Sequence, residues 1–354
     1  MVDFSLKAAA IDVEQLDSRG RAMAALGLPV NLELHTFGAR DIDSPETFET
    51  ATANVERFQA DHEVNALVVH VPLQSVAVVT SRDFDADQCL RSIEFADRVG
   101  ADAIVLHRYW GLVFGENAPR AADKQTAEEA FNAVVKDLAR AADGKRLLVE
   151  NVGHYSLLPR DGKSYLSGPL DHFFPWEIAR FRDFVRREGL QNVEPFVDVA
   201  HAALSSNLFN RKRAAGASLD GDPRFAWISD DDLEQTAWLD PFDFVDRDMP
   251  YLHASDAILL DRDQIAQADL DEAALTRSIV SEGLELGSGS LPFATLPDRF
   301  GGAGTIVLEV DPAPGESHIA NGAQCRSLAA LRDIYTKRTA GQWAGTAMGG
   351  AAAF

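Results

Sequence analysis

Short apolar runs recur along the chain, each bounded by polar, glycine or proline residues and separated by stretches long enough for a helix. This pattern is typical of strand–helix–strand units built around a parallel sheet. It predicts eight strands, at residues 4–10, 29–35, 64–71, 103–107, 146–150, 193–198, 250–254 and 305–310.

Helices are expected between these strands. Apolar residues return at three and four positions within residues 89–99, 127–142 and 176–188, which predicts amphipathic helices of an outer layer. Ser44 followed by Pro45 and Glu46 is typical of a helix start, and residues 323–337 are predicted to form the closing helix.

Eight strands with intervening helices favour a closed (β/α)8 TIM barrel, of the α/β class, over an open doubly wound sheet. Open sheets more usually have five to seven strands, and no glycine-rich phosphate turn follows the first strand. Residues 1–340 are expected to form this single domain, and the Ala/Gly-rich residues 341–354 a flexible tail. About fifty residues follow strand six and about fifty follow strand seven, and these long loops are expected to form the wall or lid of the active site.

The formal net charge of −22 disfavours nucleic acid and anionic lipid as partners, because the average surface repels phosphate. Only Cys89 and Cys325 are present and no charged-then-apolar leader opens the chain, so a reducing, cytoplasmic location is expected. No apolar run approaches the roughly 18 residues needed to cross a bilayer. A small-molecule substrate is the expected partner.

Ionisable residues stand at or just after the ends of the predicted strands. In a (β/α) barrel these ends meet at one mouth, so the side chains would be brought together there. Each residue alone could instead cap a helix or sit in the core, but several carboxylates buried together without a cation would cost several kcal/mol. The residues are His70, His107, Glu150, Asp198, His201, His253 and Glu309.

A divalent metal would remove this repulsion, with Glu150, Asp198, His253 and Glu309 as its ligands. Three carboxylates and one imidazole suit Mn²⁺, Mg²⁺, Co²⁺ or Zn²⁺, and the sequence does not choose among them. The second nitrogen of His253 needs an acceptor that the sequence does not identify.

The order of these motifs resembles the xylose isomerase-like barrel superfamily, which includes sugar isomerases and epimerases, inosose dehydratases and the endonuclease IV group. The resemblance implies that Glu150 and Glu309 move a proton as well as bind metal, that Asp198 and His253 are ligands only, and that His201 contacts a substrate oxygen. The motifs lie at residues 147–151, 196–201, 251–256, 286–289 and 306–309.

The endonuclease IV group is similar at two further positions, where His70 and His107 match ligands of a second metal bridged by the residue matching Glu150. That group also carries Asp-x-His just before its Gly-x-Gly, whereas this chain has Ser281-Glu282-Gly283 there. A complete three-metal site is therefore not expected, and the number of ions, one or two, stays open.

Substrate-binding residues are less clearly indicated. The nearest arginine after the seventh strand is Arg262, later than the substrate-binding arginine of the epimerases. Arg108 and Trp110 directly follow the fourth strand and His154 follows the fifth, so they are candidates, with packing or surface roles as the alternative.

Two enzyme functions remain. The first is a metal-dependent isomerase, epimerase or related dehydratase, which transfers a proton of a sugar, cyclitol or similar polyol through a metal-stabilised enediolate. The second is a dinuclear hydrolase or other metalloenzyme acting on a small phosphorylated or natural-product substrate. A barrel that only binds a ligand is a third class, and a homo-oligomer is an open alternative on fold analogy alone.

Overall fold

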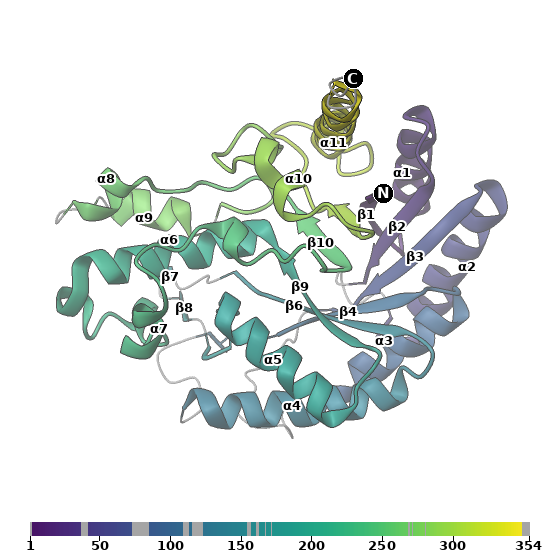
Figure 1. The fold of residues 1–354 in the computed structure, drawn as a ribbon. Coiled ribbons are helices and arrows are strands. Elements are labelled where there is room, and N and C mark those ends of the chain that lie inside the picture. The colour runs from purple at the N-terminus through teal and green to yellow at the C-terminus, as the bar shows by residue number, and fades with distance from the viewer. Residues whose placement is uncertain are drawn as a thin grey trace, which may run out of the picture.

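The computed structural model describes residues 2–36, 42–72, 85–108, 113–114, 123–153, 157–160, 163–166, 168–170, 172–267, 270, 272–279 and 281–348. Eight parallel strands form a closed barrel in the order β1-β2-β3-β4-β6-β9-β10-β11, with β11 beside β1 (Figure 1). All eight predicted strands and the (β/α)8 barrel are confirmed. The strands are β1 (Asp3–Ala9), β2 (Val30–His35), β3 (Val64–His70), β4 (Ala103–His107), β6 (Arg146–Glu150), β9 (Val193–Asp198), β10 (Tyr251–Ala254) and β11 (Thr305–Leu308).

Helices surround the barrel, and the predicted amphipathic segments are found in α3, α4 and α5. The capping residue of α2 is Ser44, whose side chain accepts a hydrogen bond from the Thr47 amide. The helices are α1 (Val13–Ala25), α2 (Pro45–Asp61), α3 (Ala86–Arg98), α4 (Lys124–Ala141), α5 (Pro175–Glu188), α6 (Val199–Ala215), α7 (Asp230–Gln235), α8 (Arg262–Ala266), α9 (Glu272–Ser278), α10 (Leu296–Arg299) and α11 (Gly322–Met348), with 3-10 turns η1 (Gly216–Leu219), η2 (Pro223–Phe225), η3 (Pro241–Asp243) and η4 (Phe293–Thr295).

A small antiparallel sheet accompanies the barrel. Its strands are β5 (Val113–Phe114), β7 (Leu157–Arg160) and β8 (Lys163–Leu166), paired in the order β5-β8-β7. It follows β4 and β6 in the chain, so it belongs to the connections at the carboxyl ends of these strands. The sequence pattern did not predict this sheet.

The long connection after β9 is built mainly around α6, not as an open loop. Residues 199–212 of α6 are all buried. Its polar side chains hold neighbouring segments: Asn207 donates to the Ile258 carbonyl at 2.8 Å, Asn210 to Leu239 at 2.9 Å, and Arg211 to Ile265 at 2.7 Å. These bonds tie the connections after β9 and β10 to one rigid helix.

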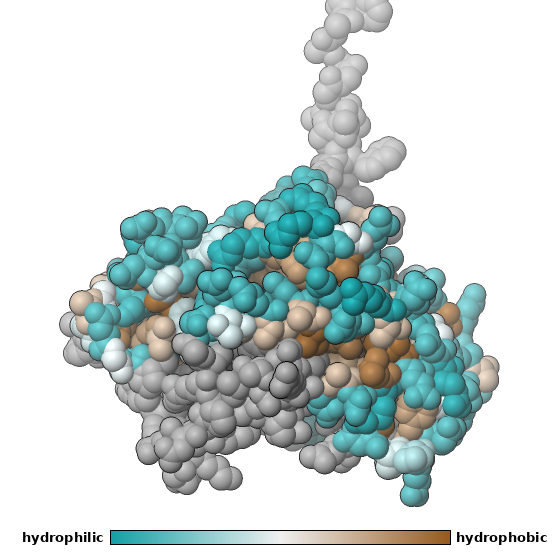
Figure 2. Space-filling model, turned by 90° about the horizontal axis from the view of Figure 1, so that it is seen from below, coloured by the Kyte–Doolittle hydropathy of each residue, from teal (hydrophilic) through white to brown (hydrophobic). Residues whose placement is uncertain are grey.

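The closing helix α11 continues to Met348, into the segment expected to be a flexible tail, and the last six residues lie outside the described part of the chain. Among the coloured residues on the face shown in Figure 2, hydrophilic ones predominate and hydrophobic ones form limited patches between them. Among the described residues no helix combines the length and the apolar character required for a transmembrane span.

The layer between barrel and helices should carry much of the stability. Phe131 of α4 is 1% exposed and packs near Phe181 of α5. Phe131→Ala should therefore lower the free energy of unfolding by about 3–5 kcal/mol, measured by urea denaturation. Leu90→Ala, at a side chain 44% exposed, is the control and should change it by about 0.5 kcal/mol or less. Equal losses in both variants would contradict this assignment of the core.

Candidate metal centre

The candidate site is positioned by the alternation of side chains along the strands. An apolar cluster made by strands alone occupies the barrel interior, and two residues further along each of these strands the next inward side chain is ionisable. The pairs are Val68 and His70 on β3, Val105 and His107 on β4, Leu148 and Glu150 on β6, Phe196 and Asp198 on β9, Tyr251 and His253 on β10, and Val307 of β11 with Glu309 just after it.

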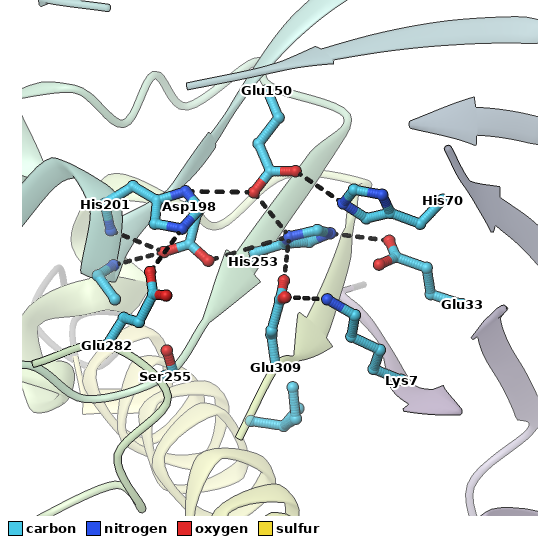
Figure 3. A network of polar contacts seen from close by, with 12 residues as sticks. Lys7, Glu33, His70, Glu150, Asp198, His201, His253, Ser255, Glu282 and Glu309 are labelled. Carbon is cyan, nitrogen blue, oxygen red and sulfur yellow. Dashed lines mark hydrogen bonds and ion pairs between the residues drawn. The ribbon is translucent and has the colours of Figure 1, made fainter. Parts of the chain in front are cut away.

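His253 lies at the centre of this group (Figure 3). Its Nδ1 is 3.1 Å from Glu150 Oε1, 2.8 Å from Glu309 Oε2 and 3.9 Å from Asp198 Oδ2. Burial alone would lower the pKa of His253, but the carboxylates of Glu150 and Glu33 raise it to about 10. The carboxylate oxygens around Nδ1 therefore favour a positive charge there, as a second proton on the ring or as a cation.

The four ligand-type atoms of Glu150, Asp198, His253 and Glu309 lie within 4.8 Å of one another. In octahedral coordination at roughly 2.1 Å, neighbouring ligand atoms are roughly 3 Å apart and opposite ones roughly 4.2 Å. The separations of 2.8, 3.1 and 3.9 Å around His253 Nδ1 match these values. The residues present therefore fit a divalent cation.

The second nitrogen of His253 has an acceptor that the sequence did not reveal. Nε2 donates to Glu33 Oε2 at 2.8 Å, and the Tyr251 hydroxyl donates to the same oxygen at 2.9 Å. Glu33 and His253 are fully buried. A carboxylate behind a ligating histidine fixes the ring and its tautomer, so Glu33 leaves Nδ1 facing the centre.

A second group of ligand atoms shares Glu150. Its Oε2 is 3.2 Å from His70 Nε2 and 3.2 Å from His107 Nε2, while its Oε1 faces His253. Burial lowers the pKa of His70 to about 4, and His70 Nδ1 donates to the Val71 carbonyl at 2.9 Å. Neutral His70 thus turns a lone pair on Nε2 toward the carboxylate, an arrangement that a cation would stabilise.

His201 joins the cluster from the first turn of α6. Its Nδ1 donates to the Asn151 carbonyl at 2.9 Å, and its Nε2 is 2.9 Å from Glu282 Oε2. Burial alone would lower the pKa of His201, but Asp198, Glu150 and Glu282 raise it well above its ordinary value. The Ser281-Glu282-Gly283 segment, which departs from the endonuclease IV pattern, therefore still brings a carboxylate to the site.

Lys7 of β1 is another site residue that the sequence analysis missed. Its ammonium contacts Glu309 Oε1, on the side of Glu309 away from Glu150 (Figure 3). Lys7 and Glu33 both stand at inward positions in the middle of apolar strands. The alternation of side chains along a strand could therefore have indicated from the sequence that both point into the barrel.

The His-x-x-Asp and Gly-x-Gly motifs have a structural explanation. The buried carboxylate of Asp256 accepts hydrogen bonds from the amides of Gly287 at 2.8 Å, Gly289 at 3.0 Å and Leu291 at 2.9 Å. A Cβ at Gly289 would lie 2.4 Å from the Ala257 carbonyl oxygen. The glycine lets this loop approach β10 closely, and Asp256 holds it there.

The structure describes only one of the three candidate substrate-binding residues Arg108, Trp110 and His154. The guanidinium of Arg108 donates to Glu128 at 2.8 Å and to the His172 carbonyl at 3.0 Å, and it stacks over Phe173, so it lies apart from the metal cluster. Its contacts match the packing alternative. Trp110 and His154 lie outside the described residues.

No family model matches the sequence, and no curated protein is significantly similar to it. Solved structures do share its fold. One is a D-allulose 3-epimerase from Methylomonas sp., with a TM-score of 0.53, 12% identity and coverage of 94% of this chain and 99% of that one. Another is a D-psicose 3-epimerase from Clostridium cellulolyticum H10, with a TM-score of 0.54, 12% identity and coverage of 94% and 99%.

A xylose isomerase-like TIM barrel/4-hydroxyphenylpyruvate dioxygenase fusion protein is also similar, with a TM-score of 0.52 and 12% identity. The match covers 96% of this chain but only 44% of the fusion protein, so the chain spans less than half of that relative. These likenesses show that the chain shares the TIM-barrel fold of these proteins, and the resemblance seen in the sequence motifs is confirmed at the level of the fold.

The Glu33–His253 contact predicts the effect of a change behind the centre. Glu33→Gln should weaken Mn²⁺ binding about 10- to 100-fold, because the neutral amide orients His253 less firmly and makes it a weaker ligand. Calorimetric titration of the metal measures this. Glu49→Gln on α2, a side chain 63% exposed, is the control and should bind as the wild type does. Unchanged affinity in Glu33→Gln would contradict the role given to Glu33.

Proposed function

We propose that the protein is a metal-dependent isomerase or epimerase, or a related dehydratase, acting on a sugar, cyclitol or similar polyol. The observation that carries this proposal is the placement of two glutamates on either side of one candidate ligand atom. Glu150 Oε1, at the end of β6, and Glu309 Oε2, just after β11, approach His253 Nδ1 at 3.1 and 2.8 Å. Two carboxylates around one position are what removal and return of a substrate proton require.

Both glutamates are prepared to act as bases. Burial would raise the pKa of Glu150, but the neighbouring His253 and His107 lower it well below its ordinary value. Glu309 is held by the Lys7 ammonium, and with a side chain 27% exposed it is the more accessible of the two. Glu309 is therefore positioned to meet a substrate entering from the mouth, with Glu150 beneath it.

A bound divalent cation would act as a Lewis acid toward adjacent carbonyl and hydroxyl oxygens and acidify the neighbouring C–H. One glutamate, as the carboxylate, would accept the substrate proton, and the other, having first taken up a proton from water, would donate one to the carbon. In this proposal His201 contacts the substrate through Nε2, because its Nδ1 donates to the Asn151 carbonyl; a substrate oxygen at Nε2 would replace or share the Glu282 carboxylate that lies 2.9 Å away.

The second candidate function is a dinuclear hydrolase or other metalloenzyme acting on a small phosphorylated or natural-product substrate. It is favoured by Glu150 Oε2, which has His70 and His107 each at 3.2 Å, an arrangement that a one-metal epimerase does not need. Two cations sharing Glu150 would suit an in-line displacement.

Metal content per chain separates the two functions. The isomerase proposal expects one metal in protein purified without chelator, retained in His107→Ala and lost in His253→Ala, because only His253 belongs to the four-residue group. Elemental analysis of the three proteins measures it. Two metals in the wild type, falling to one in His107→Ala, would instead support the dinuclear function.

The role of the glutamates is tested by exchange of substrate hydrogen with D2O, followed by NMR over a panel of ketoses and cyclitols. Glu150→Gln and Glu309→Gln should each slow exchange about 10²- to 10⁴-fold, because an amide cannot accept the proton. Glu194→Gln, on β9 and paired with Arg146 at 3.4 Å, is the control and should exchange at the wild-type rate. Intact turnover in Glu150→Gln would overturn the proposed mechanism.

A further inference from the structure

A cavity of about 320 Å³, lined mostly by polar and charged residues, adjoins the metal centre at the barrel mouth, and Glu309 belongs to both. It lies where β1, β2 and β11 end, and α1 and the start of α11 complete its wall. Figure 3 shows Lys7 and Glu309 side by side at the boundary with the metal centre. Its lining includes Lys7, Arg19, His35, Glu309, Asp311 and Gln324.

The lining side chains of Arg19 and Gln324 each carry a buried polar atom without a hydrogen-bond partner among the described residues. These atoms are Arg19 Nε and Gln324 Oε1, in side chains only 2% and 1% exposed. Buried polar atoms nearly always have a partner. One donor and one acceptor beside the same cavity therefore indicate that polar atoms of a ligand or of water complete them.

Both side chains are held rigidly by their other atoms. Arg19 donates through Nη1 to the Ile319 carbonyl at 2.7 Å and through Nη2 to the His318 carbonyl at 3.0 Å. Gln324 Nε2 donates to the Leu308 carbonyl at 2.7 Å. The remaining donor and acceptor are thus fixed in place before any ligand arrives, which lowers the entropy cost of binding.

The charges on the wall decide which ligand fits. Lys7 and Arg19 are cations, and Glu309 and Asp311 are carboxylates. His35 lies on the same wall, in register with His70 of β3. The wall thus has no net charge from these groups and offers both donors and acceptors. A hydroxyl group donates and accepts, so it can pair with every group of this wall. A phosphate only accepts at neutral pH, so it could pair with Lys7 and Arg19 but would be repelled by Glu309 and Asp311.

We propose that this cavity binds the hydroxyl-bearing end of a neutral polyol whose other end reaches Glu309 and the metal centre. The substrate class is then an uncharged sugar or cyclitol, not its phosphate ester. The inference rests on the proposed function for the chemistry at the centre, while recognition in the cavity is measured by binding alone.

The test is calorimetric titration of the Mn²⁺-loaded, full-length protein with two matched pairs of probes: xylitol and xylitol 5-phosphate, and myo-inositol and its 1-phosphate. At least one neutral polyol should bind more tightly than its phosphate. Lys7→Met should weaken that binding about tenfold through loss of one donor. Lys145→Met is the matched control, with a side chain 14% exposed against 11% for Lys7, bonded to Asp97 and the Ala101 carbonyl before β6.

A second variant tests the proposal even if Lys7→Met does not fold. Asp311 is exposed, so Asp311→Asn should fold normally and improve the affinity for the phosphate relative to the neutral polyol about three- to tenfold, by removing one repulsive charge. Tighter binding of the phosphates by the wild type, no binding of either neutral polyol, or equal binding in Lys7→Met and Lys145→Met would overturn the proposal. Failure of the wild type to bind Mn²⁺ would instead contradict the proposed function. Titration of the metal-free protein with the same polyols and phosphates would still test the proposed binding in the cavity.

Discussion

The candidate site depends on one buried carboxylate, Glu150, and the four imidazole rings around it. Glu150 is inaccessible to solvent, and its oxygens lie 3.1 Å from His253, 3.2 Å from His70 and His107, and 3.4 Å from His201. A carboxylate in such a place is stable only beside positive charge or strong donors. Its two oxygens serve different partners, so Glu150 joins the His253 group to the His70–His107 group.

The barrel lowers the conformational-entropy cost of this arrangement, because Glu150 and the four histidines around it all stand on rigid strands or on a helix. His107 pairs with Glu150 in register on β4 and β6, and His253 with Asp198 on β10 and β9. Asp198 also begins α6, where its Oδ1 accepts hydrogen bonds from the Ala200 and His201 amides at 2.6 and 3.0 Å. One carboxylate thus ends a strand, caps the helix that follows and contributes an oxygen to the site.

The metal centre and the adjoining cavity share Glu309 but are lined by different charged groups. Around His253 carboxylates predominate, so that side suits a cation. On the far side of Glu309, Lys7 and Arg19 offset the acidic groups, so that side suits uncharged oxygen atoms. In the proposed function, a polyol that spans both would have its reacting carbon at the metal centre and its other end in the cavity, and binding far from the reacting atoms would help to orient it.

The sequence alone predicted the strands well because each is a short apolar run with clear punctuation, and it placed His70, Glu150 and His253 at one mouth because parallel barrel strands share a direction. It did not predict α6, since a helix buried on all sides has no amphipathic period. The small β5-β8-β7 sheet was missed too, because strands of two to four residues leave little pattern.

Only the tertiary structure decided which polar residues meet. Glu33 and Lys7 are single charges within apolar strands, and their contacts with His253 and Glu309 join residues 220 and 302 positions apart. Arg108 directly follows His107, yet it turns to Glu128 in the outer layer. The physical reason is that strand alternation determines whether a side chain points inward or outward, while the closure and stagger of the barrel determine which inward side chains lie at the same level.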